Sequence, residues 1–286
     1  MKNILTSLML MACLSLSAQT VEQAGVTYKM INGTEAEVAA NQNTDIEGAV
    51  VIAETVNDHK VVAVADSAFY KCKKITSLQL PKSVVRMGMF ATSHCFQLTK
   101  FIVANDNPAF AVEDGVLMSK DMTTIICCPA GKTGNYKTPA QVTKIAPAAF
   151  STCKNLGKIE IGDGITELAD YTFQGCWSLA DVVFSNNLET IGQYAFANTI
   201  LQRIYFPKTL KSIGDYAFAN NSIVEVNLKG TVPPVLGKDV FGVENIDEKW
   251  CMRLYVPRGY VQTYKKDNKW RYFLRVLDVY TSRWTV

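Results

Sequence analysis

Residues 149–161 read Ala-Phe-Ser-Thr-Cys-Lys-Asn-Leu-Gly-Lys-Ile-Glu-Ile, and this pattern returns along the chain at intervals of about 23 residues. Five further copies, one of them degenerate, begin at Ala68-Phe69, Phe90, Thr172-Phe173, Ala195-Phe196 and Ala217-Phe218. A fixed period of this length indicates that one small structural unit is repeated and stacked, because a single unit cannot bury its own apolar residues.

Each unit is expected to contain a short strand. Ile159 and Ile161 are apolar, whereas Lys158 and Glu160 between them are charged. This alternation is typical of a strand with one buried face. Stacked units would therefore align their strands into a parallel sheet along one face of the array.

A short turn precedes the phenylalanine of each unit and is predicted to be helical. Three units have an aspartate three positions before the phenylalanine, at Asp66, Asp170 and Asp215, where it could cap the N–H groups of that turn. Together with a Leu-x-x-Leu-x-Leu core, the period predicts an α/β leucine-rich-repeat solenoid. We expect it to be strand-dominated, with a parallel sheet on one face, short helical turns on the other and a cap at each end.

The chain divides into segments predicted as a signal peptide at 1–18, an N-terminal cap at 19–60, a repeat array at 61–229 with an irregular insert at 104–143, and a C-terminal cap at 230–286. In the first cap, 26–30 and 36–39 are predicted to pair as strands. The turn signals Asn107-Pro108 and Asp114-Gly115 predict an irregular coil with a protruding hairpin in the insert.

The N-terminus has the pattern of a secretory leader. Lys2 precedes an apolar stretch at 4–16, and Ser17-Ala18 supplies small residues for cleavage. Lipoprotein processing at Cys13 is the alternative. Either route predicts a secreted or cell-surface protein, and no later apolar run is long enough to span a membrane as a helix.

Four of the eight cysteines occupy one repeat position: Cys72, Cys95, Cys153 and Cys176. Because this position lies among Phe and Leu residues, we predict a buried column of unbridged thiols. Cys127 and Cys128 are adjacent, and successive strand residues face opposite sides, so one of this pair can be exposed.

Composition argues against several functions. The net charge is only +3, without the Lys/Arg clusters of a nucleic-acid-binding protein. The two histidines, His59 and His94, do not belong to a visible cluster of metal ligands or a catalytic dyad, and we expect both to be solvated or hydrogen-bonded. The sequence therefore predicts no metal site, no cofactor and no enzymatic activity.

Two columns of outward-facing residues are expected along the sheet. The first contains Ser77, Lys100, Lys158, Asp181, Arg203 and Glu225, and its opposite charges can pair laterally for about 0.2–1 kcal/mol each. The second contains Gln79, Ile102, Glu160, Val183, Tyr205, Asn227 and then Tyr255. The predicted ligand-binding residues are Tyr205, Val183, Ile102, Arg203, Asn227 and Tyr255, with the hairpin region 110–118 as a second location. Scattered surface apolar residues are also common without any function.

The chain resembles the BspA-like leucine-rich-repeat proteins. The resemblance rests on the repeat Ile/Leu-Gly-x-x-Ala-Phe-x-x-Cys-x-x-Leu, on the segments 107–117 and 128–132, and on the ending 254–265 with Trp270. It implies a secreted or surface protein of anaerobic, host-associated bacteria that binds host matrix proteins or other bacteria. The family has no residue-level binding motif to transfer.

Three functional hypotheses follow from these patterns. The first is a secreted or surface-exposed, non-catalytic module that binds a protein or a glycan, in adhesion to a host or to other bacteria. The second is a structural envelope protein that self-assembles. The third, an enzyme, would need a cleft with perturbed acid and base residues. No nucleic acid is expected as a partner.

Overall fold

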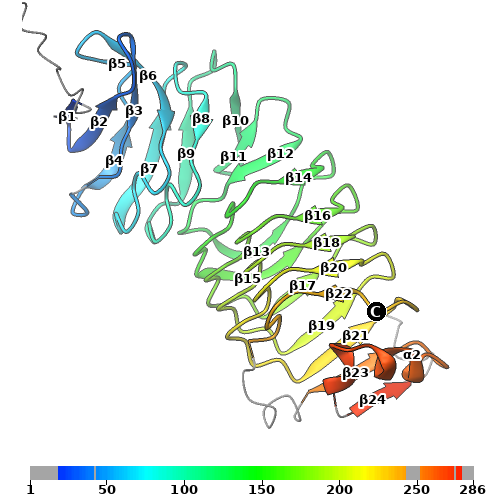
Figure 1. Ribbon diagram of the computed structural model, residues 1–286. Coiled ribbons are helices and arrows are strands. Elements are labelled where there is room, and N and C mark those ends of the chain that lie inside the picture. Colours follow the sequence, from blue (N-terminus) through cyan, green and yellow to red (C-terminus); the bar gives the residue numbers. More distant parts are fainter. Residues whose placement is uncertain (1–18, 42, 243–251, 274, 279–286) are drawn as a thin grey trace, which may run out of the picture.

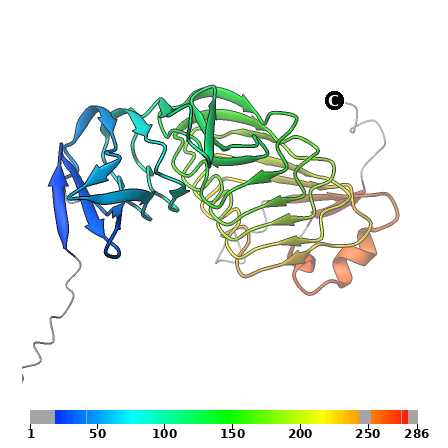
Figure 2. The same ribbon diagram turned by 90° about the horizontal axis from the view of Figure 1, so that it is seen from above.

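The computed structural model describes residues 19–41, 43–242, 252–273 and 275–278. They form an elongated stack of coils, with the N-terminal strands at one end and helix α2 (Val261–Lys266) near the other (Figures 1 and 2). The predicted signal peptide, including Cys13, lies outside the described residues.

The long strands of successive coils run parallel and form what we call the strand face. Its three ladders are β4 (Glu47–Val51), β7 (Lys74–Leu80) and β9 (Lys100–Val103); β13 (Thr133–Lys137), β15 (Asn155–Glu160) and β17 (Asp181–Val183); and β19 (Arg203–Phe206), β21 (Glu225–Leu228), β23 (Arg253–Val256) and β24 (Arg275–Asp278). The register places Lys158 opposite Asp181 and Tyr205 opposite Asn227. The expected parallel sheet is confirmed.

Two-residue strands form further parallel pairs on another side of the coils (Figure 1). One ladder contains β16 (Glu167–Leu168), β18 (Thr190–Ile191), β20 (Ser212–Ile213) and β22 (Val235–Leu236). Nearer the N-terminus, β8 (Arg86–Met87) pairs with β6 (His59–Val64), and β14 (Lys144–Ile145) pairs with β12 (Thr124–Cys127). Within the described residues, helix is limited to α2 and the 3₁₀ segment η1 (Trp270–Tyr272), so the helical part of the predicted α/β solenoid is not found in the array.

The turn before each long strand has a backbone that a helix cannot adopt. Two residues four positions apart have positive φ angles, as at Tyr171 (59°) and Gly175 (71°), and left-handed backbone interrupts a right-handed helix. Backbone N–H groups of the turn donate to the next coil instead, as Phe150 does to the Thr172 carbonyl at 2.9 Å. We call the surface made by these turns the turn face; its residues are 67–72, 90–95, 148–153, 171–176, 194–199 and 216–221.

The repeated aspartate links neighbouring coils. The prediction that it caps its own turn is wrong. Asp170 Oδ1 accepts a hydrogen bond of 2.8 Å from the backbone N–H of Gln193, 23 residues later, and Asp66 and Asp215 do the same for Met89 and Lys238. The bonded donor lies in the next coil because the N–H groups of this face point along the stack.

The core consists of two apolar clusters that meet at strand β11 (Val116–Ser119). Val116 and Met118 belong to the C-terminal cluster and Leu117 to the N-terminal cluster, because successive strand residues point to opposite sides. The repeated phenylalanines form one buried stack along the coils. Centroid distances of 5.0, 5.0 and 5.2 Å separate consecutive rings of Phe150, Phe173, Phe196 and Phe218.

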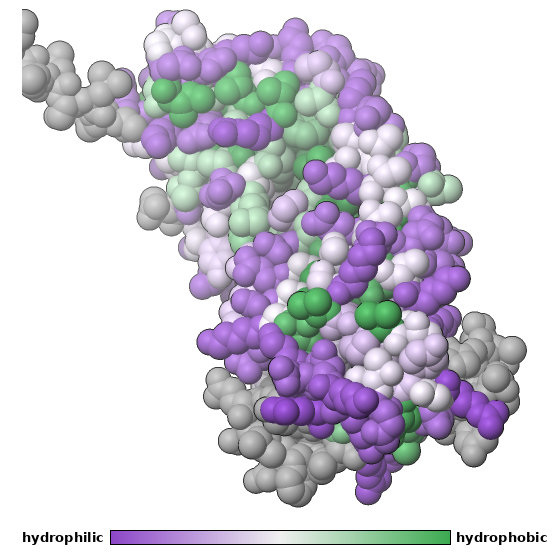
Figure 3. Space-filling view, turned by 45° about the vertical axis from the view of Figure 1, so that its right-hand side comes forward, coloured by the Kyte–Doolittle hydropathy of each residue, from purple (hydrophilic) through white to green (hydrophobic). Residues whose placement is uncertain are grey.

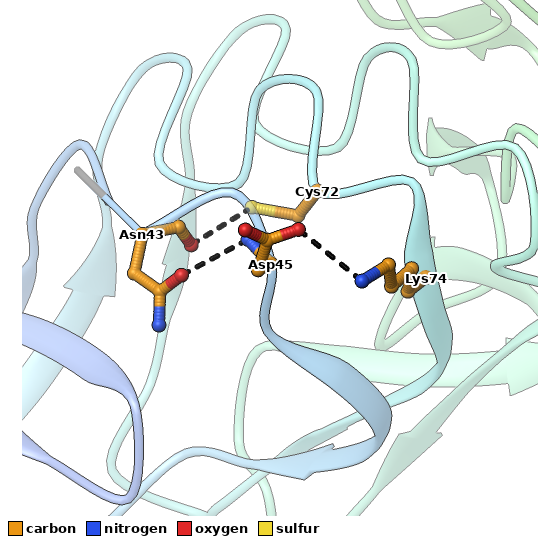
Figure 4. Close-up of polar contacts among 4 residues, drawn as sticks. All are labelled: Asn43, Asp45, Cys72 and Lys74. Carbon is orange, nitrogen blue, oxygen red and sulfur yellow. Dashed lines mark hydrogen bonds and ion pairs between the residues drawn. The ribbon is translucent and has the colours of Figure 1, made fainter.

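The cysteines at the shared repeat position are confirmed as buried, free thiols: Cys72, Cys95, Cys153 and Cys176. They also bond in a way that the sequence did not suggest. The thiols of Cys95 and Cys176 donate to the carbonyl of the preceding coil's phenylalanine, at 3.0 and 3.1 Å. Near the start of the stack, Cys72 Sγ lies 3.9 Å from the Asn43 carbonyl (Figure 4). The column therefore connects coils as well as filling space.

The insert begins with a hairpin of β10 (Phe110–Glu113) and β11, joined by Asp114-Gly115. The prediction that this hairpin protrudes is wrong. Phe110 is buried, and so are the first three residues of β11, which connect the two core clusters. Only the tip is exposed, and Lys132 Nζ holds it through a 2.7 Å contact with Asp114.

Irregular strands and a short helix occupy the two ends of the stack. Strands β1 (Thr20–Gln23), β2 (Val26–Met30) and β3 (Glu35–Val38) are antiparallel, which confirms the predicted pairing at 26–30. Strand β3 continues in parallel to β6, which also pairs with β5 (Thr55–Val56). At the other end, Tyr264 and Trp270 are buried and donate to the carbonyls of Gly230 and Pro234.

Candidate functional site

The strand face exposes three of the predicted apolar ligand-binding residues. Ile102 is 39% exposed, and Val183 and Tyr205 are each 46% exposed. They lie in three different ladders, and β13 and β15 separate Ile102 from Val183 along the stack. On the face that Figure 3 shows, apolar side chains likewise gather in separate patches between hydrophilic ones. The structure therefore does not bring Ile102 together with the other two.

Two other predicted residues of this face are not accessible. Asn227 is 4% exposed, because its amide donates along the sheet to Glu225 Oε1 at 2.9 Å and lies 3.5 Å from the Ile204 carbonyl. Tyr255, its partner in the next strand, is 8% exposed. Val183, Arg203 and Tyr205 remain as the exposed group on adjacent coils.

Charges on the strand face pair in part as predicted. Lys158 Nζ lies 3.3 Å from Glu160 and 3.4 Å from Asp181, and these hydrogen bonds raise the pKa of Lys158. The lysine is partly solvated, so its two ion pairs contribute little to stability.

The second predicted location, at residues 110–118 of the insert, is mostly buried. Phe110 is 5% exposed, and Val116, Leu117 and Met118 are fully buried. These side chains belong to the core, so a ligand could reach only the hairpin tip at Asp114.

The turn face contains a groove that the sequence did not predict. Its volume is about 480 Å³, and its lining residues are Ser67, Tyr70, Phe90, Ser93, His94, Ser151, Thr152, Gln174, Gly175, Trp177 and Asn198. A sequence signal for it existed. The residue after the repeated cysteine is Lys73, Phe96, Lys154 and Trp177 in successive copies. This position therefore varies between copies, whereas the cysteine before it is constant.

His94 is at the centre of an aromatic cluster beside this groove. Its ring centroid lies 5.1 Å from Tyr70, 5.5 Å from Phe96 and 5.9 Å from Trp177. His94 is half-buried, and its Nδ1 atom is buried without a hydrogen-bond partner among the described residues, which the prediction of a solvated or hydrogen-bonded side chain did not include. Burial, reinforced by two nearby lysines, lowers the pKa of His94 and favours the neutral ring.

Cys127 lies near the groove and is half-buried. Burial raises the pKa of Cys127 to about 12, and its Sγ contacts Thr92 Oγ1 at 3.3 Å. Among the described residues, no group of three or more His, Cys, Asp or Glu side chains is arranged to hold a metal ion. No helix among the described residues is long and apolar enough to cross a bilayer.

Comparison with known proteins identifies the family. The model of the BspA type leucine rich repeat region matches six copies, at residues 51–111 and 127–246. No curated protein matches the sequence.

Several solved structures are similar to this chain at low identity. The pneumococcal vaccine antigen PcpA is 17% identical, with a TM-score of 0.46 over 92% of this chain and 99% of that one. A leucine-rich cell surface protein from Faecalibacterium prausnitzii A2-165 is 20% identical, with a TM-score of 0.44 over 73% and 54%. For a leucine-rich repeat protein from Bacteroides ovatus ATCC 8483, the values are 17% and 0.41 over 91% and 76%. Since the family model covers more than half of the sequence, the chain belongs to the BspA-type leucine-rich repeat family.

Proposed function

We propose that the protein is a non-catalytic binding module that acts outside the cytoplasm, either secreted or on the cell surface, and that its ligand on the strand face is a protein. The family assignment and the secretory pattern of residues 1–18 support this location. Stacked repeats present an extended surface, which is suited to contact with another macromolecule.

The observation that carries the proposal is the exposed group on adjacent coils. Tyr205 projects from β19 with 46% of its surface accessible, Val183 occupies the equivalent place in the previous coil, and Arg203 is exposed two residues away. Tyrosine and arginine are enriched among residues that dominate the energy of protein interfaces. A partner with an apolar centre and acidic groups would complement this surface.

The test compares two exposed side chains on different faces. The full chain is screened against immobilised host matrix proteins and bacterial surface proteins, and then Tyr205→Ala and Val235→Ala are measured on any partner that binds. Val235 is a matched control because it is 71% exposed in the short-strand ladder. We expect Tyr205→Ala to weaken binding about tenfold or more, with an unchanged melting temperature, and Val235→Ala to have no effect.

Normal binding by Tyr205→Ala together with weakened binding by Val235→Ala would show that the strand face is not the binding surface. Turnover of a substrate by the purified protein would overturn the non-catalytic assignment. A stable dimer in light scattering, with no bound partner, would favour the self-assembling envelope protein.

A further inference from the structure

The groove on the turn face exists because the insert interrupts a regular row of hydrogen bonds. In the first two coils, backbone N–H groups at Ser67, Phe69 and Lys71 all donate to the following turn. The next turn, 90–95, has no equivalent neighbour, since the chain enters the insert. Its contacts are made by side chains instead: the His94 N–H donates to Thr152 Oγ1 at 2.7 Å.

The groove extends over several turns of the stack. Its lining residues come from five turns of the turn face, from Ser67 in the first to Asn198 in the fifth. With neighbouring strands about 4.8 Å apart, five turns extend over about 20 Å. Its volume is also within the range of ligand-binding clefts, about 300–1,000 Å³.

Aromatic rings that the fold does not bury line this groove. Trp177 is 46% exposed and Tyr70 is 39% exposed, although both belong to the cluster around His94. On the other side, Phe90 packs edge-on against Tyr171 at 5.4 Å. Core packing explains the phenylalanine stack, whose rings are buried, but it does not explain an indole that remains half open to solvent.

The polar part of the lining is uncharged. None of the described residues that line the groove is Asp, Glu, Lys or Arg, and hydroxyl and amide groups come from Ser93, Ser151, Gln174 and Asn198. His94 Nδ1 adds a buried nitrogen with no partner. A buried polar atom without a hydrogen bond is costly, so a ligand that supplies the missing bond gains affinity there.

We propose that this groove binds a glycan, with a sugar ring stacked on Trp177 and a hydroxyl group hydrogen-bonded to His94 Nδ1. The C–H groups on one face of a pyranose carry partial positive charge, which the negative face of an indole attracts. Sugar hydroxyls both donate and accept, as do the serine hydroxyl and carboxamide groups of the lining. A peptide that binds by adding a strand fits less well, because strand addition needs a free strand edge and this surface is made of turns.

This site is separate from the strand face, so it extends the proposed function and does not depend on it. The test uses the labelled full chain on an array of short neutral and sialylated oligosaccharides, followed by titration of any sugar that binds. We expect Trp177→Ala to weaken binding at least tenfold, the loss of about one stacking interaction. His94→Phe keeps an aromatic ring without Nδ1 and should weaken binding about fivefold.

Tyr205→Ala is the matched control, since it removes an equally exposed aromatic ring from the strand face. We expect it to bind glycans normally, and all three variants should keep the melting temperature of the parent. Absence of glycan binding, or equal binding by the parent and Trp177→Ala, would overturn the inference. If the parent binds a protein partner through Tyr205 but no glycan, the glycan site is excluded and the proposed function stands. If the parent binds a glycan through Trp177 but no protein, the glycan site stands and the protein ligand of the strand face is excluded.

Discussion

Replacement of Phe173 by alanine should destabilise the protein by about 3–5 kcal/mol, the usual cost of removing a buried phenylalanine and leaving a cavity. Phe173 is fully buried, and its centroid lies 5.0 Å from both Phe150 and Phe196. Two ring pairs are lost, each worth about 0.5–1.5 kcal/mol beyond burial. The cavity cannot collapse easily, because the Phe173 N–H donates to the Ala195 carbonyl at 2.7 Å and fixes the coil spacing. We therefore expect the upper half of the range.

The assay is urea unfolding followed by circular dichroism, with Val183→Thr as the matched control. Val183 lies ten residues later in the same coil, is 46% exposed, and retains a β-branched side chain after substitution. Its change should stay within about 0.5 kcal/mol. A loss below about 1 kcal/mol for Phe173→Ala would refute the reasoning, since it would mean that the ring column is not the support of the array.

Three further predictions concern the polar groups of the coils. Thiol labelling and mass mapping of the native protein should find the repeat-position cysteines unbridged and slow to react at pH 8, because burial raises the pKa of Cys72 to about 11. Asp170→Ala should cost about 1–2 kcal/mol in urea unfolding, since it removes the charged acceptor of the Gln193 N–H, whereas Asp170→Asn should cost less; equal losses would contradict this. Because the pKa of His94 is lowered in the folded state, the unfolded chain takes up its proton first, so stability should fall as pH decreases below about 6.5 and level off beneath the lowered pKa. His94→Phe should lack this decline, and an identical pH profile for the variant would exclude the histidine as its cause.

The regular part of the fold could be predicted because residues at the same position of each repeat have the same structural environment. Residues 23 positions apart occupy the same place in successive coils, so one copy with Phe150 and Ile159 inside determines the others. The conformation of the turns could not be predicted in this way. Tyr171, Tyr194 and Tyr216 adopt positive φ angles, which tyrosine rarely does, and hydrogen bonds from their backbone N–H groups to the next coil hold this conformation.

The candidate sites were harder to predict than the core for a related reason. Facing direction along a strand follows from alternation, so the exposure of Tyr205 and Val183 was foreseen. Exposure of Asn227 was also expected, but its side chain lies along the sheet to bond Glu225. Prediction of the groove would have required the point at which the insert leaves the stack. That point depends on the packing of β11 between the two core clusters.

In an array of equal coils, the backbone groups of each coil form hydrogen bonds with the neighbouring coils. A ligand site is therefore more easily formed where this regular pattern is broken. In the four coils that contain the repeated cysteine, the cysteine is buried and the residue after it varies without affecting the core. That variable position contains Lys73, then Phe96, Lys154 and Trp177, and the Lys154 ammonium lies 4.4 Å above the Phe96 ring. Aromatic residues therefore occur at this position on both sides of the insert, where the interrupted turn row also leaves His94 Nδ1 unpaired. A break in the repeat and an unusual side chain beside it are independent features of the sequence, and their meeting in one groove favours this location for a specific ligand over the uniform surface of the remaining coils.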